Sequence, residues 1–271
     1  MKIAVLGATG MLGARVYEEL LGAGHEVAPH TRLTIDLTRP WDYNQLLHAG
    51  FDWIVNCAGI VKSRVGEVSD VDTVIVNSAV PHWLEDGGAR VLQISTDCVF
   101  SGAKGAYAPT DTPDPVDLYG ASKLAGELRG PRSITIRTSF IGWEQASQRG
   151  LLEWFVRQKK VEGYARAIWS GLSAREVARA VKIAIEHSTA YSNTGGTLGQ
   201  LYHLCGSPIT KYKLLCELKR ALKLDIEIVE TLGPEIDRSL NGAKFNSTFF
   251  EYAPPTWETM AEELAREKPH A

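Results

Sequence analysis

Apolar and polar positions alternate along the first half of the chain in a way that predicts strands and helices in turn. Lys2–Leu6 is a short aliphatic run, and Met11–Leu21 repeats apolar residues at helical spacing. Short apolar strands separated by helices are typical of a parallel sheet covered on both faces. We therefore expect an α/β fold with a doubly wound parallel sheet, which right-handed crossovers produce.

The same patterns predict elements along most of the chain. The expected strands are Lys2–Leu6, Glu26–Ala28, Trp53–Val55, Arg90–Ser95, Ile134–Arg137, Leu201–Leu204 and Asp225–Val229. The expected helices are Met11–Leu21, Trp41–Leu47, Val71–Leu84, Leu118–Leu128, Leu151–Lys160, Val177–Ile185, Thr210–Lys223 and Trp257–Ala265. Ser173 is the expected N-cap before Val177–Ile185, and Glu176 is expected to complete a capping box with it.

Length and composition indicate one large globular unit with a smaller part attached. The chain has 271 residues, of which 44% are apolar and 23% charged, close to the average of folded domains. We expect residues 1–142 to form the domain built on the sheet, with 171–206 returning to it. Residues 143–170 and 207–271 are expected to form a small C-terminal α/β lobe that contacts the substrate.

Charge and cysteine content narrow the class of protein. A net charge of −3 and a pI near 6.2 make a nucleic-acid polymer an unlikely partner. Since no apolar run approaches the ~20 residues of a membrane span, and the apolar N-terminal stretch is too short for a signal peptide, we expect a cytoplasmic protein without a membrane partner. Four cysteines without C-x-x-C spacing predict neither disulfides nor a metal site.

A glycine-rich turn follows the first strand and opens the first helix. Gly7, Gly10 and Gly13 have the spacing G-x-x-G-x-x-G. Glycines here permit a tight turn, close approach of a pyrophosphate and close packing of helix on strand. The helix N-terminus offers free N–H groups to the anion. The sheet domain is therefore expected to bind a dinucleotide, with contacts from Gly7, Thr9, Gly10, Met11, Leu12 and Gly13.

The end of the second expected strand indicates which dinucleotide is bound. A carboxylate there would select NAD, but the chain has Thr31-Arg32, and an arginine suits a 2′-phosphate. We therefore expect NADPH, with NADH as the alternative. Asp36 and Leu37 are expected near the adenine. The small residues Cys57, Ala58 and Gly59 follow the third strand, where a dinucleotide lies against the backbone.

Tyr119 and Lys123 are the candidate catalytic pair. They are four residues apart on an expected helix and so share one face. An ammonium near a phenol lowers its pKa and brings it toward the range useful for proton transfer. Thr96 ends the strand Arg90–Ser95, at the edge of the sheet where such folds bind ligands, and its hydroxyl is placed to hold a substrate carbonyl.

Together these residues resemble a known superfamily. The glycine turn, Asn56–Gly59, Thr96 and the Tyr119/Lys123 pair are similar to the extended branch of the short-chain dehydrogenases/reductases, which have the Rossmann fold. Longer stretches resemble signatures of the dTDP-4-dehydrorhamnose reductase-like family: Ile94–Gly102, Leu118–Glu127, Ile136–Ser139 and, more loosely, Arg238–Trp257. The resemblance implies an NAD(P)H-dependent reductase of a 4-keto-6-deoxy nucleotide sugar.

The resemblance also implies residue roles. Tyr119 would protonate the C4 oxygen, Thr96 would hydrogen-bond it, and Lys123 would hold the nicotinamide ribose. Asp97 would touch the sugar, and Thr138 and Ser139 would lie near the nicotinamide.

Two departures from the family pattern affect the substrate pocket. Cys98 stands where the signature has Tyr, and Lys62 lies in a segment, Ile60–Arg64, that differs from the family's substrate-bordering H-T-A-V-D. Lys62, Arg64, Arg149, Arg157 and Arg238 are candidates to meet a nucleotide diphosphate. Which sugar is used therefore stays open.

Three other functions stay open. One is a nucleotide-sugar 4-epimerase and another a 4,6-dehydratase of the same superfamily, although Cys98 stands where a dehydratase needs Glu. The third is a non-catalytic regulatory subunit on this fold, against which the intact Thr96, Tyr119 and Lys123 argue. By analogy with the superfamily we expect a homodimer paired through Val71–Leu84 and Leu118–Leu128.

Overall fold

The structure is a computed structural model that describes residues 1–39, 46–144 and 149–269. Six strands form its central sheet: β1 (Lys2–Leu6), β2 (Glu26–His30), β3 (Trp53–Asn56), β4 (Arg90–Thr96), β5 (Ser133–Thr138) and β10 (Gln200–His203). They are all parallel, in the order β10-β5-β4-β3-β1-β2. The predicted doubly wound sheet is thus confirmed. β3 and β5 are buried along their whole length, as expected for inner strands of a parallel sheet that helices cover on both faces.

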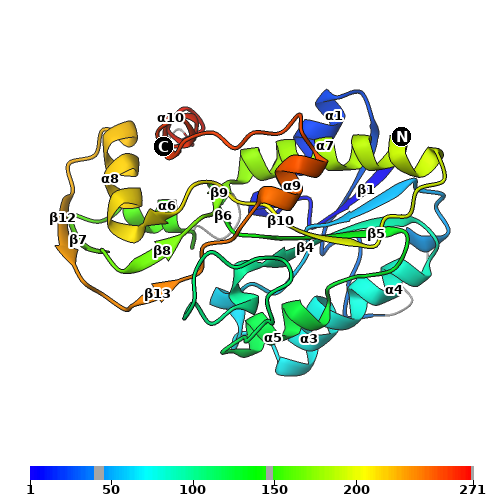
Figure 1. Cartoon of the computed structure of the whole chain (residues 1–271), viewed down its shortest axis with the longest axis horizontal. Coiled ribbons are helices and arrows are strands. Elements are labelled where there is room, and N and C mark those ends of the chain that lie inside the picture. The colour runs from blue at the N-terminus through cyan, green and yellow to red at the C-terminus, as the bar shows by residue number, and fades with distance from the viewer. Residues whose placement is uncertain (40–45, 145–148, 270–271) are drawn as a thin grey trace.

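Helices cover both faces of this sheet (Figure 1). On one face α1 (Met11–Gly22) packs along α7 (Ala174–Asn193). On the other face lie α3 (Asp70–Val74), the π-helical turn η2 (Ile75–Ala79), α4 (Val80–Asp86) and α5 (Leu118–Ala125). The predicted helix Trp41–Leu47 lies mostly outside the described residues.

A smaller part of the molecule, which we call the lobe, lies to the left in Figure 1. Its elements are α6 (Leu151–Phe155), β7 (Lys160–Tyr164), β8 (Ala167–Trp169), β11 (Ile209–Thr210), α8 (Lys211–Leu222), β12 (Glu227–Thr231) and β13 (Ile236–Asp237). The strands form a three-stranded sheet in the order β11-β8-β13 and a parallel pair, β12-β7. The domain boundaries expected at residues 142, 170 and 206 stay a prediction.

The remaining elements belong to neither the six-stranded sheet nor the lobe. They are β6 (Phe140–Ile141), which pairs with β9 (Leu172–Ser173), together with α9 (Ala243–Thr248), α10 (Trp257–Arg266), and the single turns η1 (Lys62–Arg64) and η3 (Asp97–Val99). Helix α9 packs against β10, and α10 packs against α8. Within the described ranges, no helix has both the length and the apolar character needed to cross a membrane.

Two expectations about local structure need correction. The predicted helix Leu151–Lys160 ends at Phe155, and Lys160 instead begins a strand, β7. Ser173 does cap α7, since its hydroxyl accepts a hydrogen bond from the Glu176 N–H at 3.2 Å. The Glu176 carboxylate, however, pairs with Arg179. The reciprocal half of the capping box is therefore not formed.

Candidate active site

The glycine turn lies where β1 meets the N-terminus of α1, beside the end of β3. Gly7 has φ = +73°, and a Cβ there would lie 3.0 Å from the Ala58 Cα. A Cβ at Gly13 would lie 2.1 Å from the Gly7 carbonyl oxygen, so only glycine fits. Gly10 is the N-cap and provides no side chain to bond the first-turn N–H groups. This helix end is therefore open to an anion.

The other residues expected to contact the cofactor differ in how exposed their side chains are. Thr9 is exposed and Met11 half-buried, whereas Leu12 packs into the core, so only its backbone can contact a ligand. Arg32 is exposed just beyond the end of β2. The Asp36 carboxylate accepts hydrogen bonds from the backbone N–H and the hydroxyl of Thr38, which lower its pKa. Asp36 is thus held as an anion, while Leu37 beside it is half-buried.

The candidate catalytic residues come together from β4 and α5. The Thr96 hydroxyl lies close enough to the Tyr119 phenol to act on its pKa. Asp117 caps α5 by accepting the Gly120 N–H at 2.8 Å, which fixes the first turn of the helix on which Tyr119 lies. The Lys123 ammonium, one turn on, donates to the Ile94 carbonyl at 2.6 Å. The three residues expected from the sequence therefore meet at the carboxyl end of β4.

Burial determines the pKa values of this group. The pKa of Tyr119 is raised, mainly by desolvation, and the nearby Thr96 hydroxyl opposes that rise. The expected lowering of this pKa by Lys123 is therefore wrong for this structure. Desolvation lowers the pKa of Lys123 to about 8, against the attraction of Glu127 and Cys57. Tyr119 thus keeps its proton at neutral pH, as a proton donor requires.

Asn77 is a site residue that the sequence reasoning missed. Its amide accepts from the Ile60 N–H (2.8 Å) and donates to the Ile60 carbonyl (3.0 Å) and the Ser122 hydroxyl (3.1 Å). It thus ties the chain after Gly59 to the helix of Tyr119 and Lys123. Asn77 lies in η2, and π-helical turns are frequent at functional sites. The signal was the polar pair Asn77-Ser78 inside a valine-rich segment.

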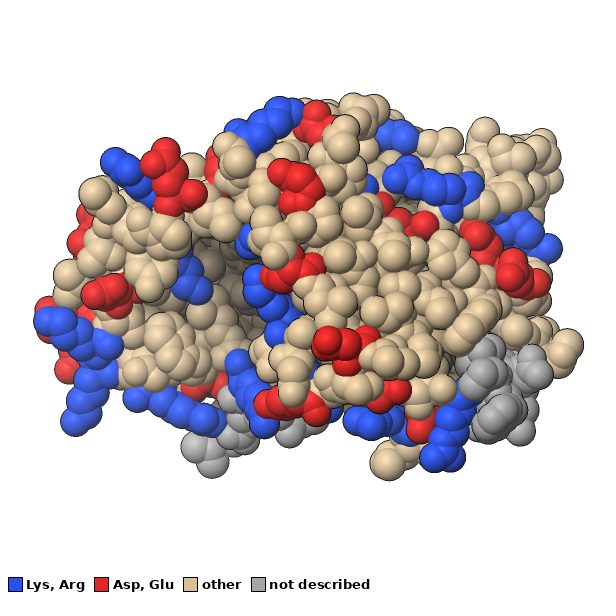
Figure 2. Space-filling view, turned by 90° about the horizontal axis from the view of Figure 1, so that it is seen from below, with Lys and Arg blue, Asp and Glu red and all other residues tan. Residues whose placement is uncertain are grey.

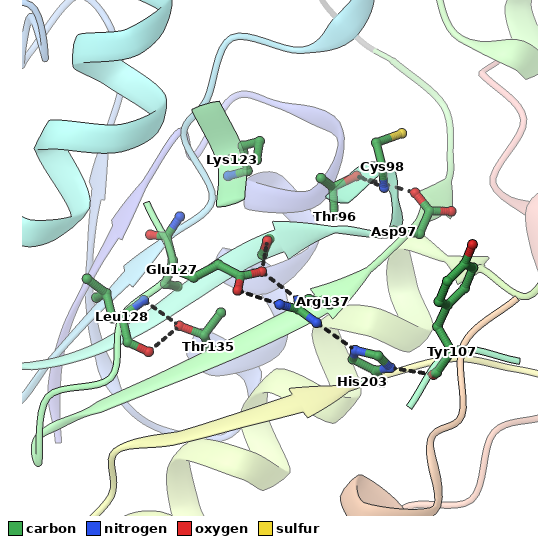
Figure 3. A network of polar contacts seen from close by, with 12 residues as sticks. Thr96, Asp97, Cys98, Tyr107, Lys123, Glu127, Leu128, Thr135, Arg137 and His203 are labelled. Atoms are coloured by element: carbon green, nitrogen blue, oxygen red, sulfur yellow. Dashed lines mark hydrogen bonds and ion pairs between the residues drawn. The ribbon is translucent and has the colours of Figure 1, made fainter. Parts of the chain in front are cut away.

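A buried ion pair lies behind the catalytic residues (Figure 3). The Arg137 guanidinium, 1% exposed, donates to both carboxylate oxygens of Glu127 at 2.7 and 2.8 Å. Glu127 also accepts from the Ser95 hydroxyl at 2.8 Å, which fixes the strand end next to Thr96. On its other side Arg137 contacts His203, whose ring reaches the Tyr107 carbonyl. This network supports β4 and α5 from beneath.

A cavity of about 360 Å³ separates the catalytic end of β4 from the lobe. Its polar side is lined by Asp97, Cys98 and Ser139. The Asp97 carboxyl is 5% exposed, and burial raises its pKa although Arg238 attracts the anion. Burial also raises the pKa of the Cys98 thiol, to about 11, so that this residue meets the cavity as a neutral thiol.

Thr138 and Ser139 follow each other at the end of β5. Ser139 lines the cavity and lies near Asp97, on whose pKa it has a lowering effect. The Thr138 hydroxyl is buried and has no hydrogen-bond partner among the described residues. A buried hydroxyl without a partner at this strand end suits a polar ligand group placed above it.

The cations expected at a diphosphate are mostly engaged elsewhere. Lys62 does not line the cavity; it pairs with Asp117 at 2.7 Å and is 56% exposed. Arg149 pairs with Glu67 at 2.5 Å. Arg238 does line the cavity, and so does Lys211, which the sequence reasoning did not select. The described residues contain no cluster of three or more His, Cys, Asp or Glu side chains suited to a metal ion.

The family model described as the RmlD substrate binding domain matches residues 1–235. The chain belongs to this family. Its similarity to a dTDP-4-dehydrorhamnose reductase from Burkholderia thailandensis is 30% identity over 230 residues, covering 78% of this chain and 75% of that protein. The enzyme of the same name from Mycobacterium tuberculosis is 29% identical over 153 residues, and this match spans only half of its length.

Solved structures confirm the fold. A dTDP-4-dehydrorhamnose reductase from Bacillus anthracis, determined in complex with NADP, superposes with a TM-score of 0.83 and covers 99% of this chain and 100% of that one. Its sequence identity is 20%, so the likeness concerns the arrangement of the elements and not the residues of the site.

Proposed function

We propose that the protein is an NADPH-dependent reductase that converts the C4 ketone of a 4-keto-6-deoxy nucleotide sugar into an alcohol. The observation that carries this proposal is the approach of the Thr96 hydroxyl to the Tyr119 phenol beside Lys123, next to the cavity that Asp97 and Cys98 line. The likeness to reductases acting on dTDP-4-dehydrorhamnose supports the substrate class. An epimerase, a dehydratase or a regulatory subunit is not favoured by any feature of this site.

The residues at the sheet edge fit the cofactor. The open end of α1 and the bare Gly7 turn suit its pyrophosphate, Arg32 suits a 2′-phosphate, and the unpartnered Thr138 hydroxyl suits a polar group of the nicotinamide half. NADP in the Bacillus anthracis relative supports the same choice. When bound, the cofactor supplies the hydride, and the chain provides binding, orientation and the proton.

Each catalytic side chain then has one task. Tyr119 donates its phenolic proton to the carbonyl oxygen as that oxygen becomes an alkoxide, and its raised pKa keeps the proton available. Thr96 donates a hydrogen bond that orients the same oxygen. Lys123, one helical turn after Tyr119 on α5, would hold the hydroxyls of the nicotinamide ribose. Asn77 keeps the backbone after Gly59 in place.

The test is NADPH oxidation with a panel of 4-keto-6-deoxy nucleotide sugars, comparing the natural chain with Tyr119→Phe. Loss of the proton donor should lower kcat by about 100-fold or more, while NADPH binding, followed by nucleotide fluorescence, stays unchanged. Turnover at the natural rate in Tyr119→Phe would overturn this mechanism. Failure to reduce any ketosugar, together with stable co-purification of a partner enzyme, would favour the regulatory function.

Assembly and location stay predictions. The exposed valines Val71 and Val74 on α3, 68% and 44% exposed, are apolar positions available to the expected homodimer. Light scattering at micromolar concentration distinguishes a dimer from a monomer. The four cysteines are free, which suits the reducing cytoplasm that we expect.

A further inference from the structure

Lys211 is a cation without a partner inside the cavity. It is the first residue of α8, after the N-cap Thr210, and lines the cavity with Leu214 from the same helix. Among the described residues, no group accepts a hydrogen bond from its ammonium and no carboxylate forms an ion pair with it. Desolvation lowers the pKa of Lys211 to about 8. An ammonium taken from water without a partner is unfavourable, which makes an anionic ligand the natural complement.

The lobe sheet places a second cation opposite Lys211. Thr210 of β11 pairs with Ile168 of β8 on one side, and Asp237 of β13 pairs with Ile168 on the other. Because β11 runs antiparallel to β8 and β13 runs parallel to it, Lys211 follows on beside Ala167 and Arg238 beside Trp169, two residues apart along β8. Since neighbouring strands are about 4.8 Å apart and each residue rises about 3.3 Å along a strand, the two backbones are about 12 Å apart. Two long basic side chains across that span can reach one small anion between them.

Arg238 is only partly engaged. Its Nε donates to the Phe100 carbonyl at 3.0 Å, and its charge attracts the buried Asp97 carboxyl. Arg238 therefore connects the catalytic end of the cavity with the end where Lys211 lies. Figure 2 shows a hollow between the lobe and the rest of the molecule, with Lys and Arg side chains along its wall.

The remaining walls of the cavity are mainly apolar. They come from Ile168, Trp169, Ile236 and Leu214, besides residues nearer the catalytic end. In such surroundings water screens charge poorly, so an anion gains more from two cations than it would at the surface. Lys62 and Arg149, by contrast, are exposed and already paired with carboxylates.

We propose that Lys211 and Arg238 bind the phosphate groups of the substrate across β8, and that Lys211 makes the enzyme select phosphorylated over unphosphorylated sugars. The inference rests on the proposed reductase function for the identity of the substrate, but the anion site itself can be tested without turnover. It gives Lys211 the role that sequence reasoning gave to Lys62.

The probe is inorganic pyrophosphate, titrated calorimetrically into protein saturated with NADP⁺. Saturation fills the Gly7 turn, which would otherwise bind the same anion. We expect Lys211→Met to weaken pyrophosphate binding by about tenfold or more, as for the loss of a charge-assisted hydrogen bond. Lys211→Arg should retain most of the affinity. Lys213→Met, an exposed lysine on the same helix, is the matched control and should bind like the natural chain.

Equal pyrophosphate affinity in the natural chain and Lys211→Met would overturn the inference, and so would binding that disappears once NADP⁺ is present. With a ketosugar that is reduced, Lys211→Met should raise KM with little change in kcat, because the residue contacts the anion and not the reacting carbon. An unchanged KM would refute the inference and leave the reductase function intact. Pyrophosphate binding that depends on Lys211 without reduction of any ketosugar would support the anion site and contradict the reductase.

Discussion

Replacing Lys211 with methionine should stabilise the protein. The change keeps an unbranched side chain of similar length and removes the unpaired charge. The native fold lowers the pKa of Lys211 from 10.5 to about 8, and 2.5 pH units at 1.36 kcal/mol each correspond to a cost of about 3 kcal/mol. Because the residue is partly exposed, solvent screening reduces this cost. We expect the free energy of unfolding at pH 7 to rise by about 1–2 kcal/mol.

The pH dependence identifies the cause of this stabilisation. Below pH 8 Lys211 is charged in both the native and the unfolded chain, so the natural protein carries the full cost. Between pH 8 and 10.5 the unfolded chain holds a proton that the native chain has lost, so stability rises with pH. The advantage of Lys211→Met should therefore be greatest below pH 8 and disappear above pH 10.5.

Urea unfolding at pH 6.5, 8 and 9.5 measures this advantage, with Lys213→Met as the control that should stay near zero throughout. Every other titrating group, including Lys123 with its similar pKa, is common to the two proteins and cancels in the difference. Equal stability at pH 6.5, or an advantage that does not shrink between pH 8 and 9.5, would refute the claim that Lys211 is an unpaired, desolvated cation.

Three further substitutions test other parts of the site. Arg32→Ala should raise the Kd of NADPH about tenfold and leave that of NADH nearly unchanged. Equal effects on both cofactors in a fluorescence titration would show that Arg32 does not contact the 2′-phosphate. Glu127→Gln takes the partner charge from the buried Arg137 and should lower the free energy of unfolding in urea by about 3–5 kcal/mol, whereas a loss under 1 kcal/mol would show that the pair is not desolvated. Cys98→Tyr should shift kcat/KM toward dTDP-4-dehydrorhamnose, and an unchanged substrate profile would show that position 98 does not contact the sugar.

The central sheet could be predicted because its strands carry their own signal. β1 and β3 are buried along nearly their whole length, and their apolar runs are visible without knowledge of their neighbours. The lobe could not be predicted in this way. In β7, Lys160 and Glu162 are exposed and Val161 is buried, a short alternation that only its pairing with β12, Lys160 with Glu227, turns into a strand.

Some residues of the candidate site could likewise be predicted from the sequence, and one could not. Gly7, Thr96, Tyr119 and Lys123 lie next to regular elements at fixed spacings, so the sequence alone placed them near one another. Asn77 belongs to the same centre, but its role depends on a hydrogen bond to a loop 17 residues earlier, at Ile60. No spacing rule connects those two positions, and only the fold brings them together.

Two basic residues show why burial and partners must be known before a role can be assigned. Arg137 is almost fully buried, yet both Glu127 oxygens neutralise it, so its charge is used within the protein. Lys211 is less buried and has no such carboxylate among the described residues, so its charge is available to a ligand. In the sequence each is a cation near apolar residues. Groups that violate the rules of stable packing are expected at functional sites, since selection retains them for binding. A gain of stability together with a loss of pyrophosphate affinity in Lys211→Met would show that Lys211 lowers the stability of the fold and contributes to anion binding.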